Sequence, residues 1–214
     1  MSKKIVFMGT ANFAVPILKN IYQNGFEIVA VYTQPPKKSD RGQKITKSPI
    51  HVMAETLNLE VRTPEKLKDN KEEYEYLKKK NLSLGVIVSY SQILTKDILN
   101  LSKNGFINLH ASILPLNRGR HPLIWAIILN LSKTASTFFL ITKRVDEGAV
   151  IDQKIVKISN LDDSKSLYKK VTKVAKSRLK FLIQKISNDK ILNHIILNSK
   201  EKKNKASNIW RKRN

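Results

Sequence analysis

Two polar residues stand at the end of an apolar run in "GFINLH", residues 105–110. Asn108 and His110 are two positions apart, so on a β-strand their side chains share one face. An unpaired polar group inside a protein costs about 1–3 kcal/mol, which disfavours such residues in a buried strand. In an open parallel sheet, ligands bind outside the carboxyl ends of the strands. We therefore expect Asn108 and His110 to point into a ligand site.

Asp146 is a third candidate, in the turn "KRVDEGAV". A carboxylate beside an imidazole stabilises the protonated ring and fixes its orientation. The chain has no cysteine and no evident nucleophilic serine, so the attacking group would belong to a substrate. The protein would then stabilise an oxyanion and transfer protons. This combination is typical of acyl transfer to an amine.

Each of these residues also has an ordinary structural explanation. Asn108 could bond to a neighbouring loop, His110 could donate to a backbone carbonyl, and Asp146 could simply stabilise a turn. Arg118 could mark the start of a helix, and Tyr90 could lie on an ordinary surface. The spacing of the residues does not decide between these explanations.

The net charge of the chain is +23, from 40 Lys and Arg against 17 Asp and Glu. Such a charge points to nucleic acid or another polyanion. A lysine-rich and asparagine-rich composition would also arise from an AT-rich genome, without any binding function. The sequence leaves both explanations open.

The composition also excludes several classes of protein. Without cysteine there are no disulfides and no Cys-ligated zinc, and the four scattered histidines form no His-Glu-x-x-His pair, so we expect no metal. The apolar runs are too short to span a bilayer or to form a secretory signal, so we expect no membrane partner and a cytoplasmic protein. The first turn, "GTANFA", has one glycine where a dinucleotide site needs three.

Strands alternate with helices along most of the chain, which predicts an α/β fold with a doubly wound, mostly parallel sheet. Two later strands are rich in β-branched residues and could run antiparallel, and a long amphipathic C-terminal helix follows them. The basic segment 35–49 has no apolar period and reads as a long surface loop. The predicted strands are 3–9, 26–34, 84–91, 105–110, 136–145 and 149–158, and the predicted helices are 13–25, 48–59, 71–81, 95–101, 121–130 and 162–187.

The stretch "NLHASILPLNRG", residues 108–119, resembles the Asn-x-His-x-Ser-Leu-Leu-Pro-x-x-x-Gly signature of the folate-dependent formyltransferases. Asp146 matches the aspartate of that family's Asp-x-Gly turn. The resemblance covers about residues 3–185 and implies a Rossmann-like formyltransferase fold. It also implies transfer of a formyl group from 10-formyltetrahydrofolate to a primary amine. The segments 4–18, 31–50 and 86–94 are most similar to members that formylate initiator methionyl-tRNA, which makes this RNA the expected partner.

The resemblance implies roles for individual residues. Asn108 and protonated His110 would stabilise the oxyanion, while Asp146 would orient His110 and help to move protons. Two segments would bind the folate, and a basic loop together with one arginine would contact the tRNA. The implied folate-binding residues are Tyr90, Gln92, Ile93, Leu94, Ser112, Ile113, Leu114 and Pro115, and the implied tRNA-binding residues are Arg41, Gly42, Lys44 and Arg118.

Three departures from the family pattern leave alternatives open. The segment "RGRHP", residues 118–122, is more similar to nucleotide-sugar N-formyltransferases, and "SYSQ", residues 89–92, replaces Ala-Tyr-Gly-Gln. The basic segment 189–214 resembles a linker to a C-terminal barrel domain, which we expect to be absent. A nucleotide-linked amino-sugar N-formyltransferase and a catalytically weak, truncated relative are therefore the alternatives. We expect residues 1–188 to form the catalytic domain of a monomer.

Overall fold

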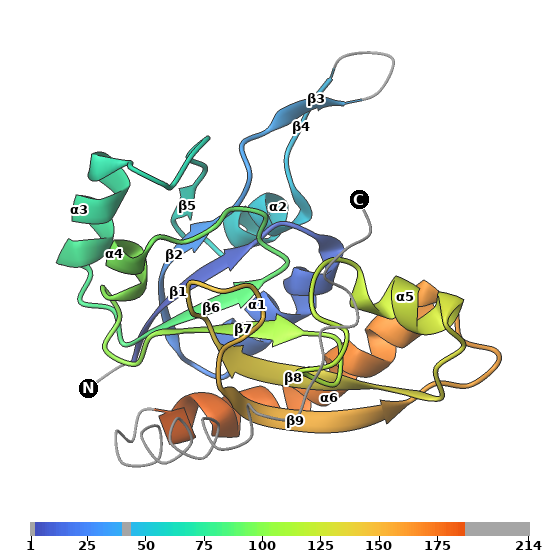
Figure 1. Ribbon diagram of the computed structural model, residues 1–214. Coiled ribbons are helices and arrows are strands. Elements are labelled where there is room, and N and C mark those ends of the chain that lie inside the picture. Colours follow the sequence, from blue (N-terminus) through green and yellow to red (C-terminus); the bar gives the residue numbers. More distant parts are fainter. Residues whose placement is uncertain (1–2, 40–43, 187–214) are drawn as a thin grey trace. The chain divides into compact units, whose positions relative to one another are not determined.

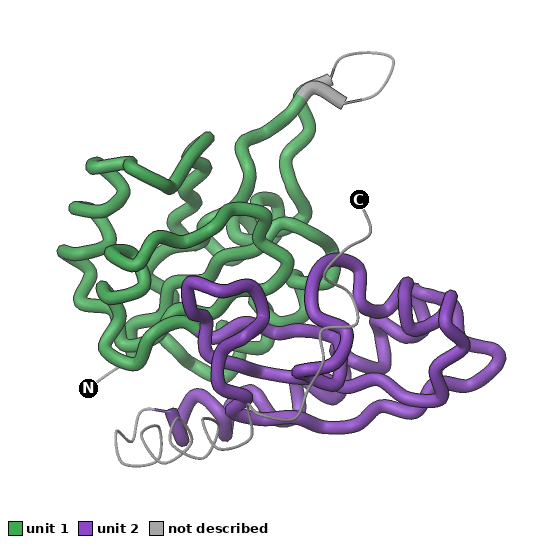
Figure 2. Tube along the Cα trace, in the orientation of Figure 1, with its two compact units in different colours: residues 1–106 green, residues 107–214 purple. Residues whose placement is uncertain are grey.

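The computed structural model describes residues 3–39 and 44–186 of the 214-residue chain (Figure 1). The chain divides into two compact units, unit 1 with residues 1–106 and unit 2 with residues 107–214, which Figure 2 colours separately. Unit 1 carries the parallel strands. Unit 2 carries antiparallel strands and the longest helix among the described residues.

Unit 1 is built on parallel strands in the order β5-β2-β1-β6. β1 (Lys4–Gly9) pairs with β2 (Glu27–Tyr32) and with β6 (Leu84–Val88), and β2 pairs with β5 (Val61–Arg62). Parallel neighbours need long crossover connections, and those between these strands contain helices. This arrangement confirms the predicted α/β class and the mostly parallel sheet. The helical elements of unit 1 are η1 (Asn12–Ala14), α1 (Val15–Gln23), α2 (Pro49–Thr56), α3 (Lys71–Lys79) and α4 (Lys96–Leu99).

The central strands of unit 1 are buried on both faces, as expected for a sheet covered by helices. The side chains from Ile5 to Met8 are fully inaccessible, and so are Val86 and Val88. Gly85 is required in this layer, because a Cβ at its position would lie 1.9 Å from the ring of Phe106. The apolar runs that predicted these strands therefore form the core of the unit.

Side-chain caps begin three of the helices. The Ser48 hydroxyl accepts a hydrogen bond from the His51 N–H at 3.0 Å, and Pro49 occupies the first helical position. Asn70 and Thr95 cap α3 and α4 in the same way. Each cap satisfies a backbone N–H that has no partner within its own helix. The predicted start of α2 at Ser48 and Pro49 is confirmed.

A short hairpin replaces part of the predicted loop 35–49. β3 (Lys37–Ser39) and β4 (Lys44–Thr46) pair antiparallel in a sheet of their own. The prediction was wrong here because backbone pairing holds these strands without an alternating apolar pattern, although the β-branched pair Ile45 and Thr46 favours a strand. Of the residues implied in tRNA binding, Arg41 and Gly42 lie outside the described residues, and the backbone of Lys44 begins β4.

A buried polar network joins β2, β5 and α3. The Tyr32 hydroxyl donates to the Glu73 carboxylate at 2.5 Å, and Arg62 donates to both oxygens of that carboxylate at 2.7 and 2.8 Å. The Arg62 guanidinium also lies 3.9 Å from the centroid of the Tyr76 ring. Burial, followed by the hydrogen bond to Glu73, raises the pKa of Tyr32 well above its ordinary value. The network supplies partners for the buried carboxylate of Glu73, whose burial without a partner would destabilise the fold.

Unit 2 contains three antiparallel strands in the order β7-β8-β9. They are β7 (Phe106–His110), which begins at the boundary between the units, β8 (Lys133–Leu140) and β9 (Val150–Lys157). The prediction that the later strands run antiparallel is confirmed. Helix α5 (Pro122–Ile128) and the 23-residue helix α6 (Ser164–Ile186) complete the unit, and α6 packs on β8, β9 and α5 (Figure 1). The predicted long helix is confirmed as well.

None of the described helices is both long and apolar enough to cross a membrane. No group of three or more His, Cys, Asp or Glu residues within residues 3–39 and 44–186 has a geometry that could hold a metal ion.

Candidate active site

Asn108 and His110 lie on one face of β7 near its carboxyl end. In the register with β8, Asn108 is opposite Phe139 and His110 is opposite Thr137. His110 is buried, with 7% of its surface exposed, while Asn108 is half-buried. The Phe139 ring meets the His110 ring edge-on, with 6.4 Å between centroids. The Asn108 amide has no hydrogen-bond partner within the described part of unit 2, so both its donor and acceptor groups are available.

Both ring nitrogens of His110 face oxygen atoms. Nε2 lies 3.0 Å from the backbone oxygen of Asn117, and Nδ1 lies 3.8 Å from Oδ2 of Asp146. The contact with Asn117 corresponds to the structural explanation for His110, a histidine satisfied by a carbonyl. The contact with Asp146 adds a carboxylate on the other side of the ring. A protonated imidazole carries two N–H donors and matches this pair of acceptors, whereas a neutral ring can donate to one of them.

Asp146 is held by the loop that follows β7. The backbone N–H of Gly119 donates a hydrogen bond to Oδ2 of Asp146 at 2.8 Å. The turn around Asp146 lies against the end of β8, where the Leu140 N–H donates to the Ala149 carbonyl. A Cβ at Gly148 would lie 1.5 Å from the Leu140 oxygen, so this position accepts no side chain. The Asp-x-Gly pattern thus has a direct steric reason in this chain.

Several residues around the carboxylate adopt the left-handed backbone region. The φ angles are 54° at Asn117, 97° at Gly119, 56° at His121 and 51° at Asp146. Glycine reaches this region without strain, and Asn and Asp tolerate it better than most residues. Strained backbone of this kind persists where the surrounding contacts determine the conformation, and it clusters at functional sites.

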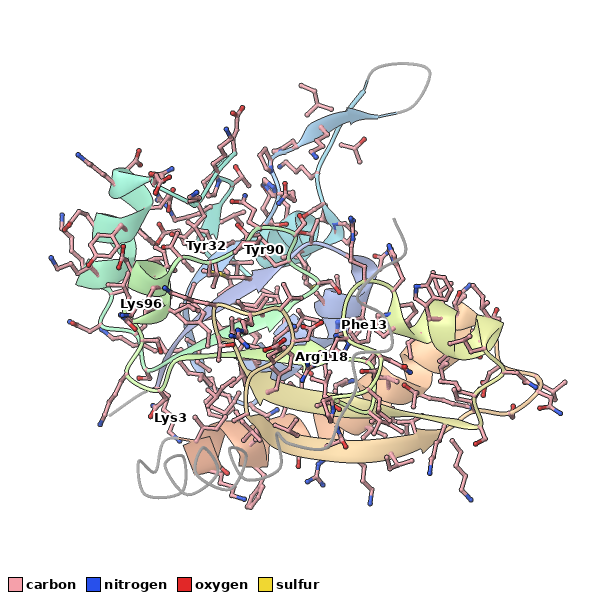
Figure 3. The ribbon with its side chains drawn as sticks, viewed as in Figure 1. Lys3, Phe13, Tyr32, Tyr90, Lys96 and Arg118 are labelled. Carbon is pink, nitrogen blue, oxygen red and sulfur yellow. The ribbon has the colours of Figure 1, made fainter. Side chains whose placement is uncertain are left out.

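An ion pair joins the same two segments a second time. Nη1 of Arg118 lies 3.4 Å from Glu147, whose carboxylate also lies 3.4 Å from Arg144. The side chains of Arg118 and Glu147 are 20% and 11% exposed, so this pair is shielded from solvent more than Arg144, at 78%. Arg118 is labelled in Figure 3. The sequence does not predict a role for Glu147, because nothing in its local pattern distinguishes it from an ordinary turn residue.

Hydrogen bonds shape the loop that begins at Ser112. The buried Ser112 hydroxyl donates to the Leu116 carbonyl at 2.9 Å, and Thr137 on β8 donates to the Ser112 carbonyl at 2.6 Å. On β9, Nε2 of Gln153 donates to the Thr137 hydroxyl at 3.0 Å and to the Leu114 carbonyl at 3.1 Å. The sequence analysis missed Thr137 and Gln153. Together these bonds fix the backbone of the predicted folate loop to the sheet of unit 2.

The remaining residues of this loop differ in exposure. Leu114 is buried, whereas Ile113 and Pro115 are half-buried. The peptide bond between Leu114 and Pro115 is cis. The loop therefore leaves parts of Ile113 and Pro115 exposed, while Ser112 and Leu114 support it from within.

Gln92 holds the predicted folate-binding segment of unit 1, residues 90–94, in place. Gln92 accepts from the Leu67 N–H at 2.7 Å and donates to the Pro64 carbonyl at 2.9 Å, so its amide anchors the segment to its own unit. Leu94 is buried, but Ile93 is 79% exposed.

Tyr90, in the same segment, is half-buried, unlike the exposed Ile93. Its hydroxyl oxygen is buried and has no hydrogen-bond partner among the described residues. Burial, followed by the charge of Glu73, raises its pKa. A buried hydroxyl without a partner is costly, so this group is suited to a polar atom of a bound ligand. Tyr90 is labelled in Figure 3.

Unit 1 also has a pocket of about 510 Å³ between α3 and α4. Its lining includes the acidic residues Asp69, Glu75 and Asp97 together with Tyr74 and Ile98. None of the predicted site residues lines it, so this pocket is separate from the chemistry predicted from the sequence.

Comparison with known proteins identifies the family. A sequence profile described as formyl transferase matches residues 3–184. The methionyl-tRNA formyltransferase of Pelagibacter ubique (strain HTCC1062) is 50% identical over 192 residues, which cover 89% of this chain and 62% of that protein. The protein of the same name from Caldanaerobacter subterraneus subsp. tengcongensis is 37% identical over 189 residues, covering 88% and 61%. The chain thus spans 61–62% of the length of these relatives.

A solved structure gives the same assignment at the level of the fold. The crystal structure of phosphoribosylglycinamide formyltransferase from Bacillus halodurans matches with a TM-score of 0.70 at 21% identity. The match covers 88% of this chain and 97% of that structure. The resemblance found in the signature and the Asp-x-Gly turn is confirmed, and this chain belongs to the formyl transferase family.

Proposed function

We propose that this chain transfers the formyl group of 10-formyltetrahydrofolate to the amino group of methionyl-tRNA. The observation that carries the proposal is the position of His110, which lies between the carboxylate of Asp146 and the loop of the family signature. A second support for the proposal is the 50% sequence identity between this chain and a protein named methionyl-tRNA formyltransferase. Because the chain spans 62% of that relative's length, the proposal concerns the 214 residues given.

The reaction begins when the neutral amine attacks the formyl carbon. A carbon–nitrogen bond forms, the carbonyl π bond breaks, and negative charge develops on the formyl oxygen. The amide N–H of Asn108 and a ring N–H of protonated His110 stabilise this oxyanion. Nε2 of His110, which is bonded to the Asn117 carbonyl at 3.0 Å, exchanges that partner for the oxyanion. The unbonded amide of Asn108 is available without breaking an existing contact.

The second step releases tetrahydrofolate. The carbonyl re-forms, the bond between the formyl carbon and N10 breaks, and N10 takes up one proton while the attacking nitrogen loses one. Asp146 orients His110 and assists this proton transfer through water. Its other partner, the Gly119 N–H, keeps the carboxylate in place at 2.8 Å throughout. The products are the N-formyl amine and tetrahydrofolate, so atoms and charges balance.

We assign the folate donor to the residues that the signature implied. The supported loop from Ser112 to Pro115 would contact it in unit 2, and Tyr90 to Leu94 would contact it in unit 1. The buried, unpartnered hydroxyl of Tyr90 supports this assignment, because it can bond to a polar ring atom. The exposed side chain of Ile93 supplies apolar surface in the same segment.

We assign tRNA contact to Arg118, to Lys44 and to the segment that contains Arg41 and Gly42. The net charge of +23 supports a polyanionic partner. We further propose that residues 1–188 are the catalytic domain, that residues 189–214 are a basic tail, and that the chain acts as a monomer in the cytoplasm.

A nucleotide-linked amino sugar is the second candidate acceptor. The observation in its favour is "RGRHP", because Arg120 and His121 are both exposed where the chain leads into α5. Exposed cationic and imidazole groups beside a catalytic loop would suit a diphosphate. This candidate shares the donor, the chemistry and the three catalytic residues with the first.

Parallel assays with two acceptors test the proposal. The chain is given 10-formyltetrahydrofolate with either charged initiator methionyl-tRNA or a dTDP-4-amino-4,6-dideoxy sugar, and the formylated product is measured. We expect product with the tRNA and none with the sugar. Product with the sugar alone would replace the first function by the second. No product with either acceptor, from a folded chain that binds the folate, would favour the catalytically weak relative.

A further inference from the structure

Helix α6 carries a row of lysines along its solvent face. Its 23 residues include no Asp or Glu. Five exposed lysines recur every three or four positions, and we call them the lysine ridge. They are Lys165, Lys169, Lys173, Lys176 and Lys180.

Helical geometry makes the ridge narrow and straight. At 3.6 residues per turn, its members fall within an arc of about 80°. At 1.5 Å per residue, the distance from Lys165 to Lys180 along the axis is about 22 Å. The opposite face is buried against β8, β9 and α5, with fully inaccessible Leu167 and Val171. The packing of α6 therefore fixes the direction in which the ridge points.

Within the described part of the chain none of the ridge lysines forms an ion pair, although the charge of Lys165 helps to lower the pKa of Asp163, whereas neighbouring cations do form ion pairs. Lys170 pairs with Asp162, and Arg178 pairs with Asp152 on β9. Both lie outside the arc of the ridge. The two ion pairs of α6 with Asp162 and Asp152 thus lie beside the ridge.

This arrangement works against the stability of the helix itself. Like charges three or four residues apart repel each other on a helix surface, and Lys165 lies at the end where the helix dipole disfavours a cation. The lysine-rich composition does not by itself impose such a pattern. Helix α3 of the same chain combines acids and lysines, namely Glu72, Glu73 and Glu75 with Lys71, Lys78 and Lys79. The absence of acids from α6 is consequently a local property.

We propose that the lysine ridge binds the phosphate backbone of a double-helical arm of the tRNA. The identity of the RNA rests on the proposed function, whereas the ridge rests on α6. A rigid row of cations matches the regular row of phosphates along one strand of a duplex, and each contact releases condensed counterions. Contacts of this kind position the RNA without reading its sequence. The ridge thus contributes to substrate affinity from outside the catalytic loop.

An anionic membrane surface is the competing partner for a basic helix. A helix that lies in a membrane interface buries its apolar face in the lipid. The apolar face of α6 is already buried in unit 2, and Phe181, at 66% exposure, lies outside the ridge arc. A duplex needs charge alone, which is what the ridge offers.

Charge removal on the ridge tests the proposal in the full chain. The ridge variant combines Lys169→Gln, Lys173→Gln, Lys176→Gln and Lys180→Gln, which keeps the helix propensity nearly constant. A matched control removes four exposed lysines of unit 1, by Lys19→Gln, Lys66→Gln, Lys68→Gln and Lys79→Gln. Binding of initiator tRNA is measured between about 50 and 200 mM salt, where phosphate contacts dominate the salt dependence. Formylation kinetics are measured on the same proteins.

The expected result is specific to the ridge. The slope of log affinity against log salt falls by about 3 in the ridge variant, since each lost contact contributes about 0.7 to 0.9. The KM for tRNA rises on the order of tenfold or more, while kcat and the KM for the folate donor stay unchanged. The control variant, with the same net charge, changes the slope by less than about 1.

Two outcomes overturn the proposal. One is an unchanged slope and KM in the ridge variant. The other is ridge-dependent binding to phosphatidylglycerol vesicles together with unchanged tRNA binding, which would assign the ridge to a membrane surface. Failure of the proposed function looks different, because the wild-type chain then makes no formyl-methionyl-tRNA. The salt slope for tRNA still decides whether the ridge binds RNA in that case.

Discussion

The carboxylate of Asp146 accepts a hydrogen bond from the backbone N–H of Gly119 at 2.8 Å, across 27 residues of sequence. This bond ties the loop after β7 to the turn before β9. His110 lies between the same two segments, with its ring nitrogens toward Asn117 and Asp146. The geometry of His110 therefore depends on how well each segment holds the other.

Replacing Asp146 with Asn separates its charge from its structural role. The amide oxygen of Asn can still accept from the Gly119 N–H, so we expect the fold to survive. In the proposed mechanism the carboxylate orients His110 and assists proton transfer, so kcat should fall by about 10²–10⁴-fold without its charge. Turnover kinetics and thermal unfolding check the two parts. Activity equal to the wild type would remove Asp146 from the mechanism.

Gly148→Ala should destabilise unit 2. The added Cβ would lie 1.5 Å from the Leu140 oxygen, and backbone must move to accommodate it. We expect a loss of about 1–3 kcal/mol in the free energy of unfolding, measured by denaturant titration. Lys143→Ala, at an exposed position of the same turn, is the control and should change little. Equal stability of both variants would contradict the close contact.

Gln153→Leu tests the support of the predicted folate loop. The substitution removes the bonds to Leu114 and Thr137 while it keeps a side chain of similar size. Each of the two lost bonds is worth about 0.5–1.5 kcal/mol, so the KM for 10-formyltetrahydrofolate should rise roughly 5- to 150-fold, with a smaller effect on kcat. Gln23→Leu, on the exposed face of α1, is the control. A fall in stability with an unchanged KM would mean that the bonds serve the fold alone.

Tyr32→Phe should weaken the buried network of unit 1. The Glu73 carboxylate loses the hydroxyl donor at 2.5 Å, which we expect to cost about 1–3 kcal/mol of stability. Tyr22→Phe, at a position that is 45% exposed, is the matched control. Calorimetry or denaturant unfolding at neutral pH distinguishes them. A loss no larger than that of the control would mean that the bond contributes no net stability.

The same tyrosine predicts a dependence of stability on high pH. Burial and the Glu73 bond raise the pKa of Tyr32 above that of an unfolded tyrosine, which is about 10. Above that pH the unfolded chain releases the phenolic proton while the folded chain keeps it, so the free energy of unfolding falls as the pH rises. Unfolding curves between pH 9 and 11 should show a shallower fall in Tyr32→Phe. Identical slopes in both proteins would contradict the shift.

Periodicity and strand chemistry predicted much of this molecule. The spacing of Asn108 and His110 placed them on one face of β7, and the apolar repeat of residues 162–187 predicted α6. Both are local properties, because the period of two or of 3.6 residues is written in consecutive side chains.

Contacts between distant segments could not be predicted in the same way. Gln153 supports the Leu114 carbonyl from 39 residues away, and Glu147 meets Arg118 only after β8 and the turn have folded back. The bond from His110 to the Asn117 carbonyl involves a backbone atom, which carries no sequence signal at all. The hairpin of β3 and β4 was missed for a related reason, since backbone pairing holds it without an apolar pattern.

The most direct test of the central claim is the single-turnover rate of formyl transfer from 10-formyltetrahydrofolate to charged initiator methionyl-tRNA, in the wild type and in His110→Ala. Single-turnover rates exclude product release and report the chemical step. We predict measurable transfer by the wild type and a rate at least about 10²-fold lower in the folded variant. An equal rate in the two proteins would contradict the assignment of His110 as the group that stabilises the oxyanion.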